Sequence, residues 1–253
     1  MEKAKRIVAS ASVRRFDAGA VPARRGPSLR AIPFQGLAGA GLVELLSEPQ
    51  RHDLERMATI QRFPARGVVY RAGAAADAVF IVADGAVKSF RELASGRCRI
   101  AAFLFAHDLF GLAAAGHYVN TTQAITPLTA YRLDVAALAG AFRRDPDLEL
   151  RFLCKAVHEL REAQHHAIIV GRRHATGRLA MLLHLLERNA PARGPDVHIP
   201  MTRSDIANYL GLSLESVVRA CGRLERQGIV AFVDRHHARI LDRPRFTALV
   251  ESA

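Results

Sequence analysis

The sequence predicts an α+β protein in which an antiparallel β-domain precedes a long amphipathic helix and a C-terminal domain of short helices with a β-hairpin. Three stretches carry this prediction: strand-like runs between about 60 and 135, a heptad pattern across 143–172, and two short helices over 202–228. The 253 residues, half of them apolar, are enough for one or two domains with a large buried core.

The charge balance indicates a polyanionic partner. Thirty-six Lys and Arg residues stand against 24 Asp and Glu residues, which gives a formal net charge of +12. Because neutralised phosphates release their counterions, such an excess favours binding to nucleic acid, here double-stranded DNA. Nearly all of the basic residues are arginines, however, and a GC-rich genome by itself also produces an arginine-rich composition.

Cysteine usage and hydropathy predict a cytoplasmic protein that does not bind membranes. The cysteines are Cys98, Cys154 and Cys221. They are too few and too scattered for a disulfide framework or a Cys-x-x-Cys metal site. The most apolar run, 100–116, is interrupted by a histidine and an aspartate and falls short of the roughly 18 apolar residues of a membrane span. Residues 1–30 lack the apolar core of a secretory signal and are expected to form a basic, flexible extension.

Residues 31–142 are predicted to form the β-domain. Its short apolar or alternating runs, at 67–73, 78–90 and 97–105, are separated by glycines. Strands of this length at regular spacing indicate an antiparallel sandwich or barrel. Segment 42–57 has its leucines on one face and is predicted to be a helix that precedes the strands.

Segment 143–172 is predicted to be a dimerisation helix. Its heptad seam consists of Leu150, Leu153, Val157, Leu160, Gln164 and Ala167. Such a seam needs a partner helix, and a charged flank of the kind found at coiled-coil edges favours a homodimer. That flank consists of Arg151, Lys155, Glu159 and Glu162. A core helix of a monomer is the alternative. Phe152 lies off the seam and is expected to face the β-domain.

Residues 173–253 are predicted to form a winged helix-turn-helix. Helix 176–190 and a turn at 191–195 come first. Thr202 with Asp205 three residues later makes an approximate capping box for the next helix. Gly211 permits a sharp turn, Ser213 caps the second helix, and Gly228 ends it. The first helix is expected to bury Ile206, Ala207 and Leu210, and the second Leu212, Val217, Ala220 and Leu224.

The outward face of the second helix has the chemistry of a DNA-reading surface. It is predicted to present Leu214, Glu215, Val218, Arg219 and Gly222. An arginine donates two hydrogen bonds to guanine and a glutamate accepts from cytosine N4, while exposed apolar groups suit the methyl of thymine. The alternative is an ordinary surface ion pair between residues one turn apart. Segment 229–241 is predicted to be a wing whose Arg235, His236 and His237 contact phosphates, or else a solvated hairpin.

The stretch IPMTRSDIANYLGLSLESVVRACGRLERQGIV, at 199–230, resembles the winged helix-turn-helix of the Crp/Fnr superfamily, and most closely its FNR/FixK branch. The likeness extends over roughly 31–245 and implies a cyclic-nucleotide-binding-like β-roll, a homodimer and RNA polymerase as a partner. It implies that Glu215 and Arg219 contact bases of a palindromic TTGA-like site, with Thr202, Arg203 and Ser213 near phosphates. Low-oxygen or nitrogen-metabolism genes would be the targets.

Two positions of the second helix depart from the family pattern. The FNR/FixK branch usually has Ser or Gly where this chain has Val218, and Crp-like members have Arg where Leu214 stands. The outer bases of the half-site are therefore left open.

The cofactors of the family are not expected here. Crp-like members hold cyclic AMP with a Glu and an Arg, for which this chain has Leu112 and Asn120. The cluster of FNR needs four thiolates, and 1–97 contains no cysteine. The paired histidines, at 165–166 and 236–237, lack the spacing of a helical zinc site. No metal is expected.

The alternatives that remain concern the signal and the class of protein. A regulator without a ligand is expected, against one gated by an unidentified small molecule in the β-roll. Cys221 is either a packed, inert thiol or a redox switch. An enzyme with a cupin-like metal site would need a His/Glu cluster on the strands, which the sequence does not supply, so no catalytic residue is assigned. An unspecific architectural DNA protein would not need the Glu215–Arg219 pair.

Overall fold

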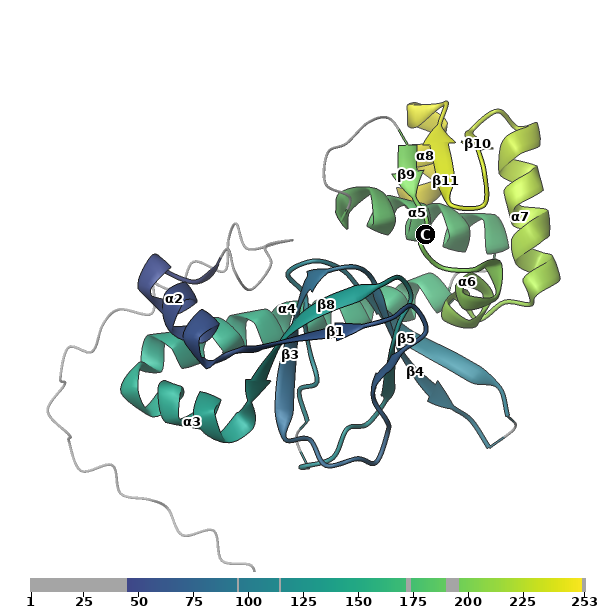
Figure 1. The fold of residues 1–253 in the computed structure, drawn as a ribbon. Helices are drawn as coiled ribbons and strands as arrows, with labels where there is room; N and C mark the ends of the chain where they lie inside the picture. Colours follow the sequence, from purple (N-terminus) through teal and green to yellow (C-terminus); the bar gives the residue numbers. More distant parts are fainter. Residues whose placement is uncertain (1–44, 95, 114, 172–173, 190–195, 252–253) are drawn as a thin grey trace, which may run out of the picture. The chain divides into compact units, whose positions relative to one another are not determined.

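The computed structural model describes residues 45–94, 96–113, 115–171, 174–189 and 196–251. The extension predicted at 1–30 and the turn predicted at 191–195 lie outside the described residues. The described chain starts with a short helix, passes through a β-rich region and a long helix, and ends in a region of shorter helices with a small sheet (Figure 1).

Most of the strands and helices lie in the segments where the sequence predicts them. The strands are β1 (Thr59–Phe63), β2 (Val68–Tyr70), β3 (Ala78–Asp84), β4 (Val87–Glu92), β5 (Cys98–Leu104), β6 (Leu109–Phe110), β7 (Thr121–Ala124), β8 (Leu128–Asp134), β9 (Asp196–His198), β10 (Val230–Phe232) and β11 (His237–Ile240). The helices are α2 (Glu48–Met57), α3 (Val135–Arg144), α4 (Pro146–Gly171), α5 (Ala175–Asn189), α6 (Arg203–Leu210), α7 (Leu214–Arg226) and α8 (Arg243–Glu251).

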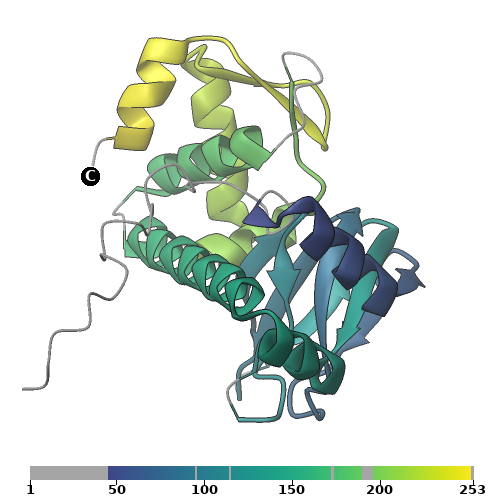
Figure 2. The ribbon, with the colours of Figure 1, turned by 90° about the vertical axis from the view of Figure 1, so that its left-hand side faces the viewer.

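Strands β1 to β8 form a β-roll of two antiparallel sheets, in the orders β1-β8-β3-β6 and β2-β7-β4-β5. Strand β3 is apolar almost throughout because both of its faces are buried. Phe80 and Val82 point into the space between the sheets, whereas Val79 and Ile81 contribute to a second cluster beneath the helices. Helices α2, α3 and α4 supply the other side of that second cluster. Figures 1 and 2 both show α4 lying alongside the strands.

Helix α2 is shorter than the helix predicted at 42–57. It begins at Glu48 because Ser47 is its N-cap: the Ser47 hydroxyl accepts from the backbone N–H of Gln50, and the Gln50 side chain accepts from the backbone N–H of Ser47. This capping box satisfies two backbone N–H groups that a helix start leaves without partners, and so fixes the boundary.

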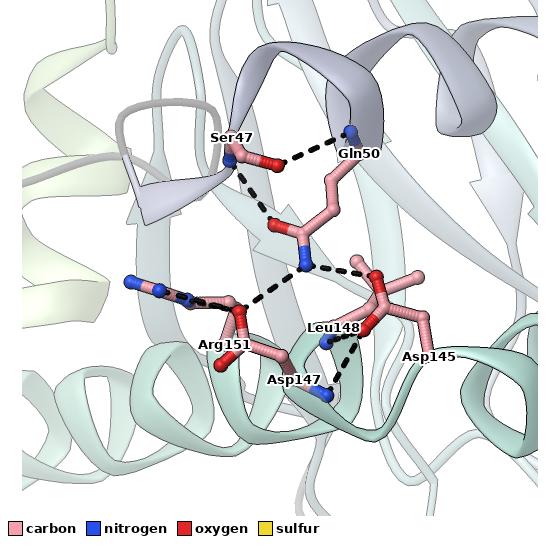
Figure 3. Close-up of polar contacts among 6 residues, drawn as sticks. All are labelled: Ser47, Gln50, Asp145, Asp147, Leu148 and Arg151. Atoms are coloured by element: carbon pink, nitrogen blue, oxygen red, sulfur yellow. Dashed lines mark hydrogen bonds and ion pairs between the residues drawn. The ribbon is translucent and has the colours of Figure 1, made fainter.

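The same glutamine ties α2 to the start of α4 (Figure 3). Gln50 Nε2 donates to Asp145 Oδ2 at 2.9 Å and to Asp147 Oδ2 at 3.3 Å. Asp145 Oδ1 in turn accepts from the backbone N–H groups of Asp147 and Leu148. Hydrogen bonding from Gln50 holds the pKa of Asp145 below its ordinary value. The first turn of α4 is therefore positioned against α2.

Helix α4 corresponds to the long helix predicted at 143–172, with a break at Asp145 that separates it from α3. Helix α3 was not predicted. Phe152 packs edge-on against Phe142 of α3, with ring centroids 5.1 Å apart, and is buried in the cluster beneath the β-roll. The expectation that Phe152 faces the β-domain is confirmed.

Lys155 departs from the prediction. It was assigned to the charged flank of the seam, but its side chain is only 1% exposed and faces the β-roll. Its Nζ lies 3.2 Å from Asp108 Oδ1 and 2.9 Å from Glu159 Oε1. Burial by itself lowers the pKa of the Lys155 ammonium, but the two carboxylates outweigh it and the pKa is raised. Heptad position alone did not reveal this because Asp108, the more distant partner, is 47 residues away.

The C-terminal region is a winged helix-turn-helix. Helices α5, α6, α7 and α8 pack with a three-stranded antiparallel sheet of order β10-β11-β9 around one core. Leu179, Leu210, Val217 and Leu224 are fully buried at its centre. Ile100 and Phe103 of β5 belong to the same cluster, so the β-roll contributes side chains to the core that supports α6 and α7.

Candidate nucleic-acid interface

The two ends of helix α6 are fixed by local signals that were predicted from the sequence. The Thr202 hydroxyl accepts from the backbone N–H of Asp205 at 3.1 Å, and Asp205 Oδ2 accepts from the backbone N–H of Thr202 at 3.2 Å, which completes the capping box. Gly211 ends the helix at φ 66°, a left-handed conformation that glycine adopts without strain. Ile206 and Leu210 are buried between these two caps.

Helix α7 carries the predicted second set of caps. The Ser213 hydroxyl accepts from the backbone N–H of Ser216 at 3.1 Å, and Gly228 follows the C-cap at φ 65°. Val217, Ala220 and Leu224 are buried as expected, whereas Leu212 is only partly buried. The opposite face of α7 is left exposed.

That exposed face presents the four predicted base-contacting residues together. Leu214 and Val218 are about half exposed, at 50% and 55%. Arg219 Nη1 donates to Glu215 Oε1 at 2.8 Å, and Arg219 Nη2 lies 3.4 Å from the Ser216 hydroxyl. Both ionic side chains remain mostly in solvent, with 66% and 75% of their surface exposed. An exposed pair of this kind contributes only about 0.3–0.5 kcal/mol to helix stability, so the fold itself has little need of it.

The residues expected near phosphates lie in different environments. Thr202 and Ser213 are exposed at the starts of α6 and α7. Arg203 is only partly exposed: its guanidinium lies over the ring of Phe232, 4.7 Å from the centroid, and its Nη1 is buried without a hydrogen-bond partner. Arg203 thus joins α6 to β10 of the wing.

The wing has the predicted hairpin, β10 and β11, and gains β9 as a third strand that the sequence did not indicate. Arg235 is exposed at the turn. His236 Nδ1 is 3.1 Å from the carbonyl oxygen of Ile199, and His237 Nδ1 is 3.0 Å from Asp234 Oδ2. Arg235 is therefore the wing residue with the clearest access to a phosphate.

Contacts from the β-roll to α6 were not foreseen. Lys88 of β4 places Nζ 2.6 Å from Asp205 Oδ1, on the residue that caps α6. Burial opposes ionisation of Asp205, but hydrogen bonds from Lys88 and Thr202 prevail and its pKa is lowered. Tyr209 of α6 packs against Phe103 with the two rings tilted and their centroids 4.8 Å apart.

His166 of α4 packs on the same tyrosine, with ring centroids 4.0 Å apart. Its Nε2 lies 2.8 Å from the carbonyl oxygen of Tyr209. Burial lowers the pKa of this imidazole, which favours the neutral ring. Lys88 and Asp205 are 117 positions apart, and His166 and Tyr209 are 43 positions apart, so no local signal in the sequence could have predicted these contacts.

The predicted dimer seam forms an exposed face of α4. Leu153 and Leu160 are 59% and 58% exposed, and Leu150, Gln164 and Ala167 are exposed as well, whereas Val157 is half-buried. Ile168 adds a further exposed apolar side chain. An amphipathic helix of this length ordinarily buries its apolar face, so the single chain leaves this face without its usual cover.

The interior of the β-roll is filled by aromatic rings. Tyr70 and Tyr118 stack with centroids 3.7 Å apart, and Phe80 and Phe110 stack at 5.2 Å. The Tyr118 hydroxyl donates to the carbonyl oxygen of Ala78 at 2.7 Å. Burial raises the pKa of Tyr70 to about 12.

The two positions that matter for a cyclic nucleotide do not fit one. Leu112 is exposed and apolar, and Asn120 is partly buried and neutral. A cyclic nucleotide brings an anionic phosphate and a ribose hydroxyl, which need a cation and an acceptor. Neither side chain supplies them.

Cys221 lies on the inner side of α7 with 8% of its surface exposed. Burial raises the pKa of its thiol, although Arg203 nearby opposes the rise. The redox reading required an exposed thiol with a lowered pKa, so the structure favours the packed, inert alternative.

The described residues contain neither a metal-ligand cluster nor a membrane-spanning helix. No three His, Cys, Asp or Glu side chains in this part of the chain come together as ligands for a metal ion. Among the same residues, no helix has the length and apolar character that crossing a membrane requires.

A β-roll followed by a long helix and by a winged helix with an exposed Glu–Arg pair defines a transcription regulator of the helix-turn-helix class. The Crp-like helix-turn-helix domain matches 177–249, and the cyclic nucleotide-binding domain matches 60–145. The nitrogen fixation regulation protein FixK of Rhizobium meliloti is 32% identical over 175 residues, covering 69% of this chain and 77% of the relative. The chain belongs to the Crp/Fnr family of transcription regulators.

Other relatives agree with this assignment. The transcriptional activatory protein AadR of Rhodopseudomonas palustris is 29% identical over 214 residues, which cover 83% of this chain and 89% of AadR. The structure of FixK2 from Bradyrhizobium japonicum matches with a TM-score of 0.73 and 31% identity, over 78% of this chain and 98% of FixK2. The β-roll, long helix and winged helix-turn-helix expected from the sequence are confirmed, as is the resemblance to the FNR/FixK branch.

Proposed function

We propose that this regulator acts as a homodimer that binds a palindromic TTGA-like DNA site through α7. The observation that carries the proposal is the solvent-exposed Glu215–Arg219 pair, joined at 2.8 Å on a helix capped at both ends. Because the pair adds little to stability, its placement on the outer face of the second helix of a helix-turn-helix is best explained by contact with bases.

The chemistry of the pair suits one G·C step. Arg219 keeps N–H groups free beyond the one that Glu215 holds, and a guanidinium presents two of them to guanine O6 and N7. Glu215 accepts from cytosine N4 on the opposite strand. Leu214 and Val218 flank the pair with apolar surface for thymine methyl groups. Thr202, Ser213 and Arg235 are positioned to contact phosphates, and Arg203 would do so only by leaving Phe232.

The exposed face of α4 supports the homodimer. Two copies of the seam from Leu150 to Ala167 would cover one another and place two α7 helices on inverted half-sites. Two-fold symmetry then requires half-sites about one helical turn, near 34 Å, apart. We propose the division of the chain into 31–142, 143–172 and 173–253 as β-roll, dimerisation helix and DNA-binding domain.

The residues of the β-roll indicate which ligands could regulate this protein. Leu112, Asn120 and the aromatic interior support regulation without a cyclic nucleotide, and an iron–sulfur cluster lacks the cysteines that it needs. They also weigh against a small-molecule gate inside the β-roll. By analogy with the FixK proteins, the targets would be genes of nitrogen or low-oxygen metabolism, transcribed by RNA polymerase in the cytoplasm. The relatives are regulators, and we assign the chain no catalytic activity.

The test is a competition assay over all single-base variants of one TTGA half-site. Arg219→Ala should lower affinity for the palindrome by roughly 1–3 kcal/mol relative to random DNA, and Glu215→Ala should relax preference at the same base pair. Arg188→Ala is the matched control, because Arg188 is an exposed arginine of the same domain that lies on α5 and not on α7. If Arg219→Ala weakens every variant equally, α7 does not read bases and the function shrinks to unspecific DNA binding.

A further inference from the structure

Gly222 is a glycine inside α7 that the fold does not explain. It is the ninth of the 13 residues of the helix, where glycine is among the least favourable residues because it gains no side-chain contact and loses the most backbone freedom. A helix that must keep its shape against DNA would ordinarily carry alanine at such a position. The glycine therefore calls for a reason outside helix stability.

The structure rules out three intramolecular reasons for the glycine. Gly222 does not have a positive φ, unlike Gly211 and Gly228 at the ends of the two helices. A Cβ built on Gly222 has no neighbour within 4 Å, so no packing contact requires its absence. Arg226 Nε donates to the carbonyl oxygen of Gly222 at 3.1 Å, but the Arg226 side chain also lies beyond 4 Å of that Cβ.

The position of Gly222 on the helix points to the partner. At 3.6 residues per turn, Gly222 lies within roughly 20° of Glu215 around the helix axis and about 10 Å further along it. Arg226 continues the same line one turn later. Since the N-terminal residues of such a helix contact base edges and the major groove is about 12 Å wide, Gly222 lies where the helix leaves the groove beside its wall.

We propose that Gly222 is the point of closest approach between α7 and the sugar–phosphate backbone of the DNA, with Arg226 beside it as a phosphate contact. The missing side chain lets the backbone of the helix approach the DNA strand, as glycine does where another chain must come close. This inference rests on the proposed function, because it takes α7 to be the helix in the groove. Gly222 would face the DNA backbone and not a base, so a substitution at Gly222 should weaken binding equally for all DNA sequences.

The experiment compares Gly222→Ala and Gly222→Leu with Gly140→Ala in the full-length protein. Gly140 is also inside a helix, α3, and its Cβ would meet only the ends of arginine side chains, at 3.5 Å and beyond. Both alanine variants should raise the Tm, by about 2–4 °C. Only Gly222→Ala should weaken DNA binding, by about tenfold, because a Cβ would be forced against the DNA strand. Gly222→Leu should weaken it further.

Binding is measured by titration of the palindromic duplex and of random duplex at fixed salt. Equal losses on both duplexes support contact with the DNA backbone, and a loss confined to certain base pairs overturns it. Wild-type affinity in Gly222→Ala, or a lower Tm, also overturns the inference, because the glycine would then be neutral or needed for folding. A wild-type protein that does not prefer the palindrome refutes the proposed function separately, since that measurement involves no variant at Gly222.

Discussion

Lys155 carries a charge in a place where charges are costly. Its ammonium is buried against the β-roll, and the carboxylates of Asp108 and Glu159 compensate for the water it has lost. Burial raises the pKa of Glu159, and the Lys155 ammonium opposes that rise. Removing the lysine would leave two partly buried carboxylates facing each other without a cation. Removing one member of such a buried charge cluster therefore destabilises the fold by more than the complete cluster stabilises it.

We therefore expect Lys155→Ala to destabilise the protein by about 3 kcal/mol, at the lower end of the range for broken buried pairs, because both carboxylates keep some solvent contact. The difference from wild type should shrink as the pH falls below neutral, since Glu159, whose pKa burial raises in the folded state, takes up a proton there more readily than in the unfolded chain. Urea unfolding at several pH values measures both effects.

Arg151→Ala is the matched control for Lys155→Ala. Arg151 pairs with Asp147 one turn away on the same helix, but both side chains are about half exposed, so the loss should stay below about 1 kcal/mol. Equal losses in the two variants would show that Lys155 contributes no more than a surface ion pair.

At the scale of single elements, α4 has two faces with different partners. Phe152 and Lys155 contact the β-roll and its covering helices within one chain, while Leu153 and Leu160 remain exposed. The heptad pattern described the exposed face, and the assignment of that face to a second copy of the chain stays a prediction.

Leu160→Glu should convert the proposed dimer to monomers that bind DNA weakly, because two unpaired carboxylates would be buried at the centre of the seam. Light scattering measures the mass in solution. Leu241→Glu is the control, since Leu241 is exposed to nearly the same extent, 57% against 58%, but lies outside α4. If Leu160→Glu keeps the mass of the wild type, the seam has been assigned wrongly.

At the scale of the whole molecule, the β-roll is linked to the DNA-binding helices by contacts within one chain. Lys88 bonds the residue that caps α6, and Phe103 packs on Tyr209 of the same helix. Stacked aromatic rings occupy the interior of the β-roll, and its strands β4 and β5 support α6 through Lys88 and Phe103.

Cyclic AMP should consequently neither bind to this protein nor tighten its binding to DNA. Leu112 and Asn120 offer no charge to a phosphate, and a buried anion without a cation is poorly held. Isothermal calorimetry with cyclic AMP and cyclic GMP is the measurement. Micromolar binding of either nucleotide would contradict the assignment of the β-roll as a domain without a cyclic nucleotide.

The parts of the fold that could be read from the sequence are those defined over a few residues. The capping box of Thr202 and Asp205, the left-handed turn at Gly211 and the exposed Glu215–Arg219 pair all depend on hydrogen bonds or spacings of three or four positions. Strand periodicity and the heptad of α4 are local in the same sense. Such patterns repeat along the chain and need no knowledge of what lies across the core.

Other features were decided by contacts between distant segments. Lys155 was predicted to lie on the exposed flank of α4, but it is buried because the β-roll brings Asp108 beside it. Lys88 contacts Asp205, which is 117 positions away in the sequence. The third strand of the wing, β9, exists only through pairing with β11. The charge and hydrophobicity of a residue are the same in the sequence whether its side chain is solvated or contacts a distant partner. Packing determines which of the two it meets, and with it whether a charge is solvated or stabilises the core.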